Sequence, residues 1–153
     1  MYDVLKALHV IGVVLLVGNV TITAYWKVLA DRTSDPKIVA HAQRGVNVAD
    51  WIFTLAGIAL VMIGGYGAAW VKGLPLFDSI WLVGGQILFV VSGMMWLGIL
   101  VPLQIRQGRA ARLFANAERI PIDYLRDAQR WLVWGIIATL PLVAATVLMV
   151  LKP

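Results

Sequence analysis

The sequence predicts an all-α, polytopic membrane protein: an antiparallel bundle of four transmembrane helices with cytoplasmic helical extensions. Two observations carry this prediction. Of its 153 residues, 61% are hydrophobic and 14% are charged, whereas about 25% of a typical soluble domain is charged. Four apolar runs reach the length of about 20 residues that a helix needs to cross a bilayer. We expect one domain with helices over about 4–26, 36–71, 79–118 and 122–151.

The first apolar run, Val4 to Trp26, is expected to stay in the protein as a membrane helix. It is longer than the apolar core of a secretory signal, and no small-residue cleavage site precedes a mature domain. Its unusual residue is His9. Ionisable side chains are rare within membrane helices and generally functional there, so His9 is the first candidate site residue.

The second helix is predicted to begin at Asp35-Pro36, where Asp suits the N-cap and Pro suits the first helical position. A helix that continues from Pro36 to about Ala69 is longer than the hydrocarbon core of a bilayer. Its first turns should therefore project into the cytoplasm. The turn from Lys72 to Asp78 ends it, and Asp78 or Ser79 is expected to cap the third helix.

The third and fourth helices are joined by a basic connection. Arg106, Arg109 and Arg112 fall on one face of a helical extension, which either lies at the membrane interface or is a solvated face without a partner. Pro121 ends this segment. In the lead-in to the fourth helix, Asp127 and Arg130 lie one turn apart and are expected to interact. Further on, Pro141 is expected to bend the fourth helix.

Charge fixes the expected orientation. Ten of the 13 Lys and Arg residues lie in the two long connections, and only Lys6, Lys72 and Lys152 lie on the other side. By the positive-inside rule the long connections are cytoplasmic and both termini are outside, in the periplasm of a bacterium whose inner membrane holds the chain. The net charge of +5 is then explained by topology and anionic lipid, and we expect no nucleic-acid partner.

Helical periodicity predicts which faces point into the bundle. On the first helix a small or polar stripe is formed by His9, Gly12, Leu16, Asn19 and Thr23. The matching stripes on the other helices are Asn47, Asp50, Thr54, Gly57, Val61 and Gly65; Gly85, Gln86, Phe89, Ser92 and Gly93; and Gly135, Thr139, Leu142 and Thr146. Most of this pattern is typical of helix packing in membranes.

Depth along the helices divides the candidate residues into two groups. His9, Gln86 and Met62 belong to the outer half of the membrane, together with Tyr66, Thr146 and Met149. Asp50 belongs to the inner end, where it is expected to pair with a basic neighbour such as Arg44 or Arg130. The sequence therefore predicts an imidazole site near the outside and a charge cluster near the cytoplasm.

The chemistry open to these residues is narrow. The chain has no cysteine, which excludes disulfides, thiolate metal sites and cysteine nucleophiles. One His and one deep Asp at opposite membrane depths form neither a hydrolytic triad nor a closed metal site. No phosphate-binding Gly-rich loop and no H-E-x-x-H motif occurs.

A buried neutral imidazole suits b-type haem, and a four-helix bundle can hold one. We therefore expect a haem- or porphyrin-binding redox protein, a membrane oxidoreductase, with His9 as the metal ligand and Gly12, Gln86 and Met62 at the cofactor-binding site. Met62 or Met149 would supply the sixth ligand, or that position would be open. The other histidine, His41, lies in the cytoplasmic lead-in and cannot reach His9.

Other interpretations remain open. His9 can also be a hydrogen-bonded packing residue. The scarcity of reactive groups favours a non-catalytic scaffold or accessory subunit that joins a homodimer or a larger membrane complex. A faint repeat, in which Ala42-Gln43-Arg44 matches Ala128-Gln129-Arg130, is the basis for a third interpretation, a small transporter.

Several segments carry a resemblance to known families. With K-A-L-H-V-I-G-V-V from Lys6, GNVTITAYWKVLADRT from Gly18 and QRWLVWGIIATL from Gln129, the chain resembles a bacterial family of predicted integral membrane proteins over nearly its full length. The K-x-x-H start also resembles, more distantly, the HemJ type of protoporphyrinogen oxidase and the CopD type of copper-related membrane protein. That second resemblance implies that His9 matches a haem-ligating position. Where the HemJ type has histidine and lysine early in its third helix, this chain has Leu82 to Gln86.

Overall fold

The computed structural model describes residues 1–152 and consists of four helical rods. It is 88% helical, and the described residues form no strand. The first and last rods are single helices; the middle two are each divided by a five-residue π-helical segment, η1 or η2. The elements in chain order are α1 (Tyr2–Arg32), α2 (Pro36–Ala49), η1 (Asp50–Thr54), α3 (Leu55–Lys72), α4 (Ile80–Met95), η2 (Trp96–Leu100), α5 (Val101–Phe114) and α6 (Ile122–Leu151).

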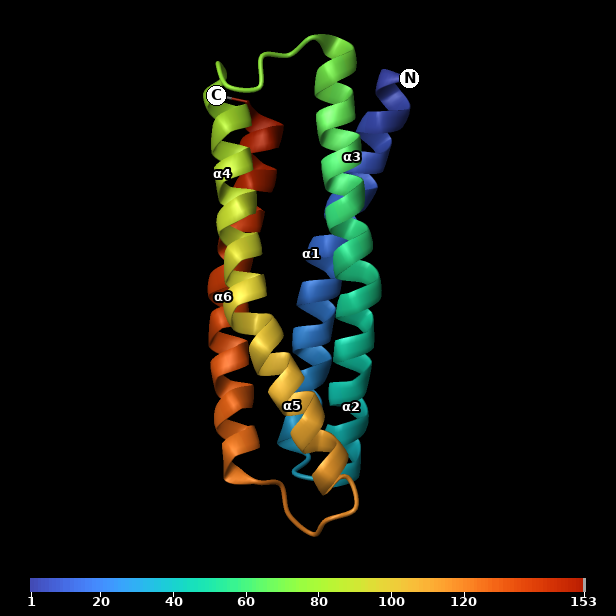
Figure 1. Ribbon diagram of the computed structural model, residues 1–153, viewed down its shortest axis with the longest axis vertical. Coiled ribbons are helices and arrows are strands. Elements are labelled where there is room, and N and C mark those ends of the chain that lie inside the picture. Colours follow the sequence, from blue (N-terminus) through green and yellow to red (C-terminus); the bar gives the residue numbers. More distant parts are fainter. Residues whose placement is uncertain (153) are drawn as a thin grey trace.

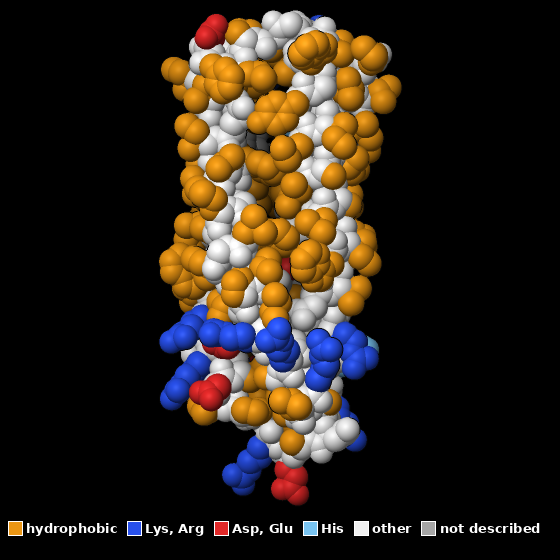
Figure 2. All heavy atoms as spheres, viewed as in Figure 1, with side chains coloured by type: hydrophobic (Ala, Val, Ile, Leu, Met, Phe, Trp, Pro, Cys, Tyr) orange, Lys and Arg blue, Asp and Glu red, His pale blue; other side chains and the backbone are white. Residues whose placement is uncertain are grey.

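All four rods are long and apolar enough to cross a membrane, which confirms the all-α, four-span prediction. They contain 31, 37, 35 and 30 residues. At 1.5 Å per residue each exceeds the roughly 30 Å of a hydrocarbon core. Figure 2 shows where the excess lies: Lys and Arg side chains form a belt across the lower third of the molecule, and the surface above the belt is almost entirely apolar. We call the end with this belt the basic end.

The rods are arranged as two pairs. α1 packs along α3 and α4 packs along α6, and both termini lie at the end opposite the basic end, beside the α3–α4 loop (Figure 1). Beyond η2 the third rod leaves α6, and α5 crosses toward α2 (Figure 1). The two pairs are therefore joined mainly at the basic end.

Local sequence explains where the rods begin and end. Asp35 caps α2: its carboxylate accepts from the backbone N–H groups of Lys37 and Ile38, at 2.8 and 3.3 Å, as predicted. Gly73 ends α3 in a left-handed conformation, with φ of 62°, that a residue without a Cβ adopts readily. Ser79 is the N-cap of α4 but makes no side-chain capping bond.

Glycines allow α1 and α3 to approach closely. A Cβ on Gly12 would lie 2.7 Å from the backbone nitrogen of Val61, and a Cβ on Gly57 would lie 3.1 Å from the carbonyl oxygen of Gly12. A Cβ on Gly64 would strike the backbone of His9. Such close approach is how membrane helices associate where lipid supplies no hydrophobic drive.

The predicted inward stripe of α1 is confirmed, since Gly12, Leu16, Asn19 and Thr23 are all buried. The predicted stripe of the fourth helix is only partly buried. The buried residues of α6 are Tyr124, Ala128, Trp131 and Ala138, whereas Gly135 and Thr139 are only half-buried. Because α6 packs chiefly on α4 and α5, its most buried residues face these helices, while Leu142 and Thr146 of the predicted stripe face the space between the two helix pairs.

The hydrophobic core is concentrated toward the basic end. One cluster joins α2, α5 and α6 through Val39, Ala111, Phe114, Tyr124 and Ala128. A second joins α2, η2, α5 and α6 through Val46, Leu100, Leu103, Trp131 and Ala138. α5 is thus part of the helical core and does not lie flat at a membrane surface; its Arg106 is exposed and pairs at 2.8 Å with Asp127, which the sequence had assigned to Arg130.

Candidate functional site: a cavity between two helix pairs

A cavity of about 600 Å³ lies between the two helix pairs, in the half of the molecule that holds both termini. Figure 2 shows the surface hollowed between the pairs in that half. The wall is mostly apolar and comes from α1, α3, α4, α6 and the α3–α4 loop. Its residues with charged or strongly polar side chains are Tyr2, Lys6, His9, Tyr66, Gln86, Thr146 and Lys152. Ligand sites have this size and this mixture of apolar wall and few polar groups.

His9 is held in one orientation at this wall. Its Nδ1 lies 2.9 Å from the backbone oxygen of Val61 on α3, and a Cβ on Gly65 would lie 2.8 Å from the same nitrogen. A carbonyl oxygen can only accept a hydrogen bond, so Nδ1 must carry the proton. In the neutral imidazole, Nε2 is then the unprotonated nitrogen with a free lone pair.

Gln86 has a mainly structural set of hydrogen bonds. Its Nε2 donates to the backbone oxygens of Leu76, at 3.0 Å, and Leu82, at 3.1 Å. Its Oε1 accepts from the hydroxyl of Tyr66 at 3.0 Å. Gln86 therefore ties the α3–α4 loop and α3 to α4.

Two methionines line the cavity, Met62 on α3 and Met149 on α6. The Met149 side chain lies over Gly85, in the space that a Cβ there would fill. Gly12, by contrast, is buried between α1 and α3 and is not among the lining residues. The structure therefore brings His9, Met62 and Gln86 of the predicted site to one cavity and places Gly12 behind its wall.

The rim of the cavity carries two ammonium groups that the sequence had not linked to His9. Lys6 lies one turn before His9 on α1, and Lys152 at the end of α6 lies over the Trp81 ring, 5.2 Å from its centroid. Spacing alone could have found Lys6, because residues i and i+3 share a helix face. Lys152 could not be found in that way, since only tertiary contact brings it to the rim.

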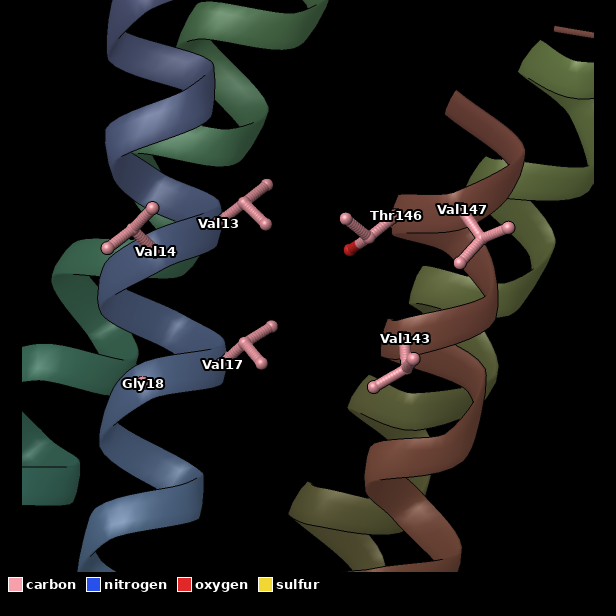
Figure 3. A pocket seen from close by; sticks show the side chains of 7 residues that line it. All are labelled: Val13, Val14, Val17, Gly18, Val143, Thr146 and Val147. Atoms are coloured by element: carbon pink, nitrogen blue, oxygen red, sulfur yellow. The ribbon is translucent and has the colours of Figure 1, made fainter. Parts of the chain in front are cut away.

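The cavity continues sideways into a groove between α1 and α6. This groove has a volume of about 310 Å³ and is lined by valines, Gly18 and Thr146. Figure 3 shows Val13 and Val17 pointing from α1 toward α6, and Thr146 pointing back toward α1. Four of these residues, Val13, Val14, Val17 and Thr146, also line the larger cavity. An apolar ligand could enter through this side, which carries no charged residue.

A second polar cluster surrounds Asp50. The carboxylate accepts from Asn19 Nδ2 at 2.8 Å, from Thr54 Oγ1 at 3.4 Å and from Gln104 Nε2. The predicted pairing with a basic residue is wrong, because Asp50 belongs to none of the ion pairs among the described residues. Arg44 and Arg130 are exposed, as expected for strongly hydrated groups at the membrane edge.

A chain of buried polar groups lies further toward the basic end. Lys27 Nζ donates to the hydroxyl of Tyr124 at 2.9 Å, which donates to Gln43 Oε1 at 3.1 Å. Gln43 Nε2 donates in turn to Asn47 Oδ1 at 2.8 Å. The sequence does not predict that Lys27, Gln43 and Tyr124 form a group, although the spacing of Gln43 and Asn47, four apart on a helix with apolar neighbours, indicates that these two side chains can interact.

No group of three or more His, Asp and Glu side chains comes together as a metal site in the described part of the chain. The only imidazole at the cavity is His9, since His41 is exposed on α2. A metal at the cavity would therefore have to bring most of its own ligands, as the iron of a tetrapyrrole does.

Comparison with known proteins agrees with the membrane fold. No curated protein and no solved structure matches the chain. A family model described as predicted integral membrane protein (DUF2269) matches residues 3–153. With that match over nearly every residue and four membrane-length helices in the structure, the chain belongs to the DUF2269 family of predicted integral membrane proteins.

Proposed function

We propose that this membrane protein binds haem or a related porphyrin in the cavity between its helix pairs, with His9 as axial ligand, and acts in redox chemistry. The observation that carries the proposal is the orientation of His9. Its Nδ1 is committed to the Val61 carbonyl 2.9 Å away, so Nε2 is the nitrogen left for a metal. Metal-ligating histidines nearly always donate their other ring N–H to a carbonyl, carboxylate or water in this way.

The volume and polarity of the cavity also support this proposal. A volume of about 600 Å³ lies within the range of about 300–1,000 Å³ typical of cofactor sites. The apolar wall suits a flat macrocycle, and the ammonium groups of Lys6 and Lys152 at the rim suit its carboxylate side chains. His9 lies one helical turn deeper than Lys6, so one ligand could contact both.

The rest of the wall sets what the site can do. A bound haem would supply one-electron transfer, and its potential depends on the second axial ligand. The thioethers of Met62 and Met149 are the candidate sixth ligands at this cavity. The apolar wall disfavours water, and Gln86 with Tyr66 supplies polar groups to the wall. In this proposal the basic end faces the cytoplasm of a bacterium and both termini are periplasmic.

An absorption spectrum tests the proposal directly. The protein is purified in mild detergent from haem-replete cells, and reduced-minus-oxidised spectra are recorded for the wild type, His9→Ala and His41→Ala. We expect a haem spectrum in the wild type and in His41→Ala, and its loss in His9→Ala. Absence of a haem band from the wild type, or an undiminished band in His9→Ala, would contradict the proposal.

The rim lysines have a test of their own. Lys6→Gln combined with Lys152→Gln should weaken retention of the anionic ligand during washing, and the effect should shrink at high salt because the contact is electrostatic. Lys37→Gln is the matched control, since Lys37 is exposed on α2 at the basic end and does not line the cavity. Equal loss of ligand from both proteins would rule out a role for the rim charges.

A second proposal, a non-catalytic scaffold or accessory subunit, is supported by a different observation. Gly18, Gly93, Gly98 and Gly135 have open space where a Cβ would be, so these small residues are not used for packing within the chain. Small residues on membrane helices commonly mark contacts with other helices. Crosslinking in native membranes should then trap a homodimer or a defined larger complex; recovery of monomers only would count against this role.

A further inference from the structure

Asp50 is a buried carboxylate without a positive partner. Asp50 is 6% exposed, and no Lys, Arg or His nitrogen of the described residues lies within 4.0 Å of its carboxylate oxygens. Its hydrogen-bond partners are neutral and come from three elements, Asn19 on α1, Thr54 on η1 and Gln104 on α5. An unpaired charge in such surroundings is costly, and ionisable residues inside membrane proteins commonly mark proton or ion pathways.

We propose that Asp50 is a proton-binding site, loaded from the basic end of the molecule through a column of buried polar side chains. The reaction is the transfer of a proton from hydronium to the carboxylate, which gives a neutral carboxylic acid and water. The Gln104 amide can serve both forms: its Nε2 donates to the carboxylate, and after a flip its Oε1 accepts from the acid. The proposal is independent of whether the cavity between the helix pairs holds haem.

The partners of Asp50 favour a proton over a metal cation. Hard cations such as Na⁺, Mg²⁺ and Ca²⁺ are bound by several oxygen atoms. Around Asp50, Asn19 and Gln104 instead present N–H groups to the carboxylate, and Thr54 presents its hydroxyl hydrogen. Donors arranged in this way compete with a metal ion for the carboxylate oxygens.

The column to the basic end begins at a partly exposed carboxylate. Asp31, whose side chain is 22% exposed, lies 3.2 Å from Lys27 Nζ. From there hydrogen bonds of 2.9, 3.1 and 2.8 Å connect Lys27 to Tyr124, Gln43 and Asn47 in turn. In this column Lys27, Gln43 and Tyr124 are buried and Asn47 is half-buried. Asp31 is the only carboxylate among the five residues.

Gln107 lies between this column and Asp50. It is 1% exposed, and neither of its amide atoms has a hydrogen-bond partner in the protein. On the same face of α5, Gln104 contacts Asp50 one turn before it and Gly108 adjoins Asn47 one residue after it. Buried amides that lack protein partners are generally satisfied by water. Gln107, with a bound water, would connect the two clusters.

The Asp50 site does not open into the cavity between the helix pairs. None of Asp50, Asn19, Thr54 and Gln104 lines that cavity, and its deepest lining residues on α1, Leu16 and Val17, are apolar. The nearest charged groups on the helices around Asp50 are directed elsewhere: Lys27 binds Asp31 and Tyr124, Arg106 binds Asp127, and Arg44 and Arg130 are exposed. Proton exchange should therefore occur only with the basic end.

Two π-helical segments add independent support. Asp50 is the first residue of η1, and η2 immediately precedes the helix that carries Gln104. Such segments are rare and occur frequently at functional sites. Asp50 lies within one irregular turn, and Gln104 lies shortly after the other. The backbone there can adjust when the Asp50–Gln104 hydrogen bond changes.

Infrared difference spectroscopy tests proton binding. The full chain, labelled with ¹³C-aspartate and placed in lipid nanodiscs, is titrated with acid. We expect a carbonyl band of a protonated carboxylic acid that grows as the pH falls, shows the isotope shift, disappears in Asp50→Asn and persists at a shifted position in Asp50→Glu. Asp123→Asn is the control, because Asp123 is 88% exposed. The proposal is overturned by absence of the band at every pH, by its persistence in Asp50→Asn, or by displacement of the proton by Na⁺ at constant pH.

The exchange rate of the same proton tests the column. After a change from H₂O to D₂O, the band of the wild type should shift quickly. Tyr124→Phe and Gln107→Leu should slow the shift severalfold, because each removes a link between Asp50 and the basic end. Tyr66→Phe, the same deletion at the opposite end, should leave the rate unchanged. Equal rates in all four proteins, or a slow shift in Tyr66→Phe alone, would refute access from the basic end.

Discussion

The contact between α1 and α3 gives the sharpest prediction for the fold, because it positions His9. In Gly64→Ala the three atoms nearest to the added Cβ would all be backbone atoms of α1: the His9 nitrogen, the Leu5 oxygen at 2.7 Å and the His9 Cα at 2.9 Å. Ordinary carbon contacts are about 3.5–4.0 Å. Backbone of a packed helix cannot rotate away as a side chain can, so α1 must move outward by about 1 Å.

The cost can be estimated from this geometry. Overpacking of this kind typically destabilises a protein by about 1–3 kcal/mol, and a separation of about 1 Å forfeits up to roughly half of each dispersion contact along the interface. Alanine returns at most about 1 kcal/mol through its higher helix propensity. Gly64→Ala should therefore be clearly less stable than the wild type, and its His9–Val61 hydrogen bond should lengthen.

Gly45→Ala is the matched control. Gly45 lies on α2 with nothing within 4 Å of its would-be Cβ, so the same substitution there should stabilise the helix by up to about 1 kcal/mol. The free energy of unfolding is measured in mixed micelles with increasing SDS, followed by the fluorescence of the seven tryptophans. Equal stability of the two variants would refute the account of the α1–α3 contact.

Three further variants test other parts of the structure. Gly65→Ala pushes on the imidazole of His9 and not on backbone, so it should alter the proposed haem spectrum while the free energy of unfolding changes by less than in Gly64→Ala; an unchanged spectrum would show that the ring position does not matter. Tyr124→Phe removes a buried hydroxyl with two partners and should cost about 1–3 kcal/mol in the same unfolding assay, more than Tyr66→Phe at an exposed bond; the reverse order would be inconsistent with a buried column. Asp35→Ala removes the cap of α2 and should cost about 1 kcal/mol, and no loss of helix signal or stability would contradict capping.

Much of the fold could be predicted from hydropathy alone, because the length of an apolar run and the cost of unpaired backbone in lipid leave helices as the solution. The inward face of α1 was also predictable. Asn19 and Thr23 stand out in an apolar helix, and polar groups there must face protein. On α6 no such contrast exists: Ala138 and Thr139 are both small, and the choice between them depends on where α4 and α5 lie.

The candidate sites show the same division. His9 could be found because it is the one imidazole in an apolar span. The partners of Asp50 could not, because sequence spacing suggests a salt bridge with a nearby arginine while water holds arginine at the membrane edge. The π-helical turns η1 and η2 add residues to a helical turn and change which side chains share a face, and no local residue pattern marks them.

The central claim, a porphyrin held by His9 in the cavity, is tested most directly by the amount of haem bound per chain. The pyridine haemochrome content of the purified protein is measured for the wild type, His41→Ala and His9→Ala. We predict about one haem per chain in the first two proteins and almost none in His9→Ala. The reason is that His9 Nδ1 donates to the Val61 carbonyl, which leaves Nε2 free to bind the iron. Equal haem content in all three, or none in the wild type, would contradict it.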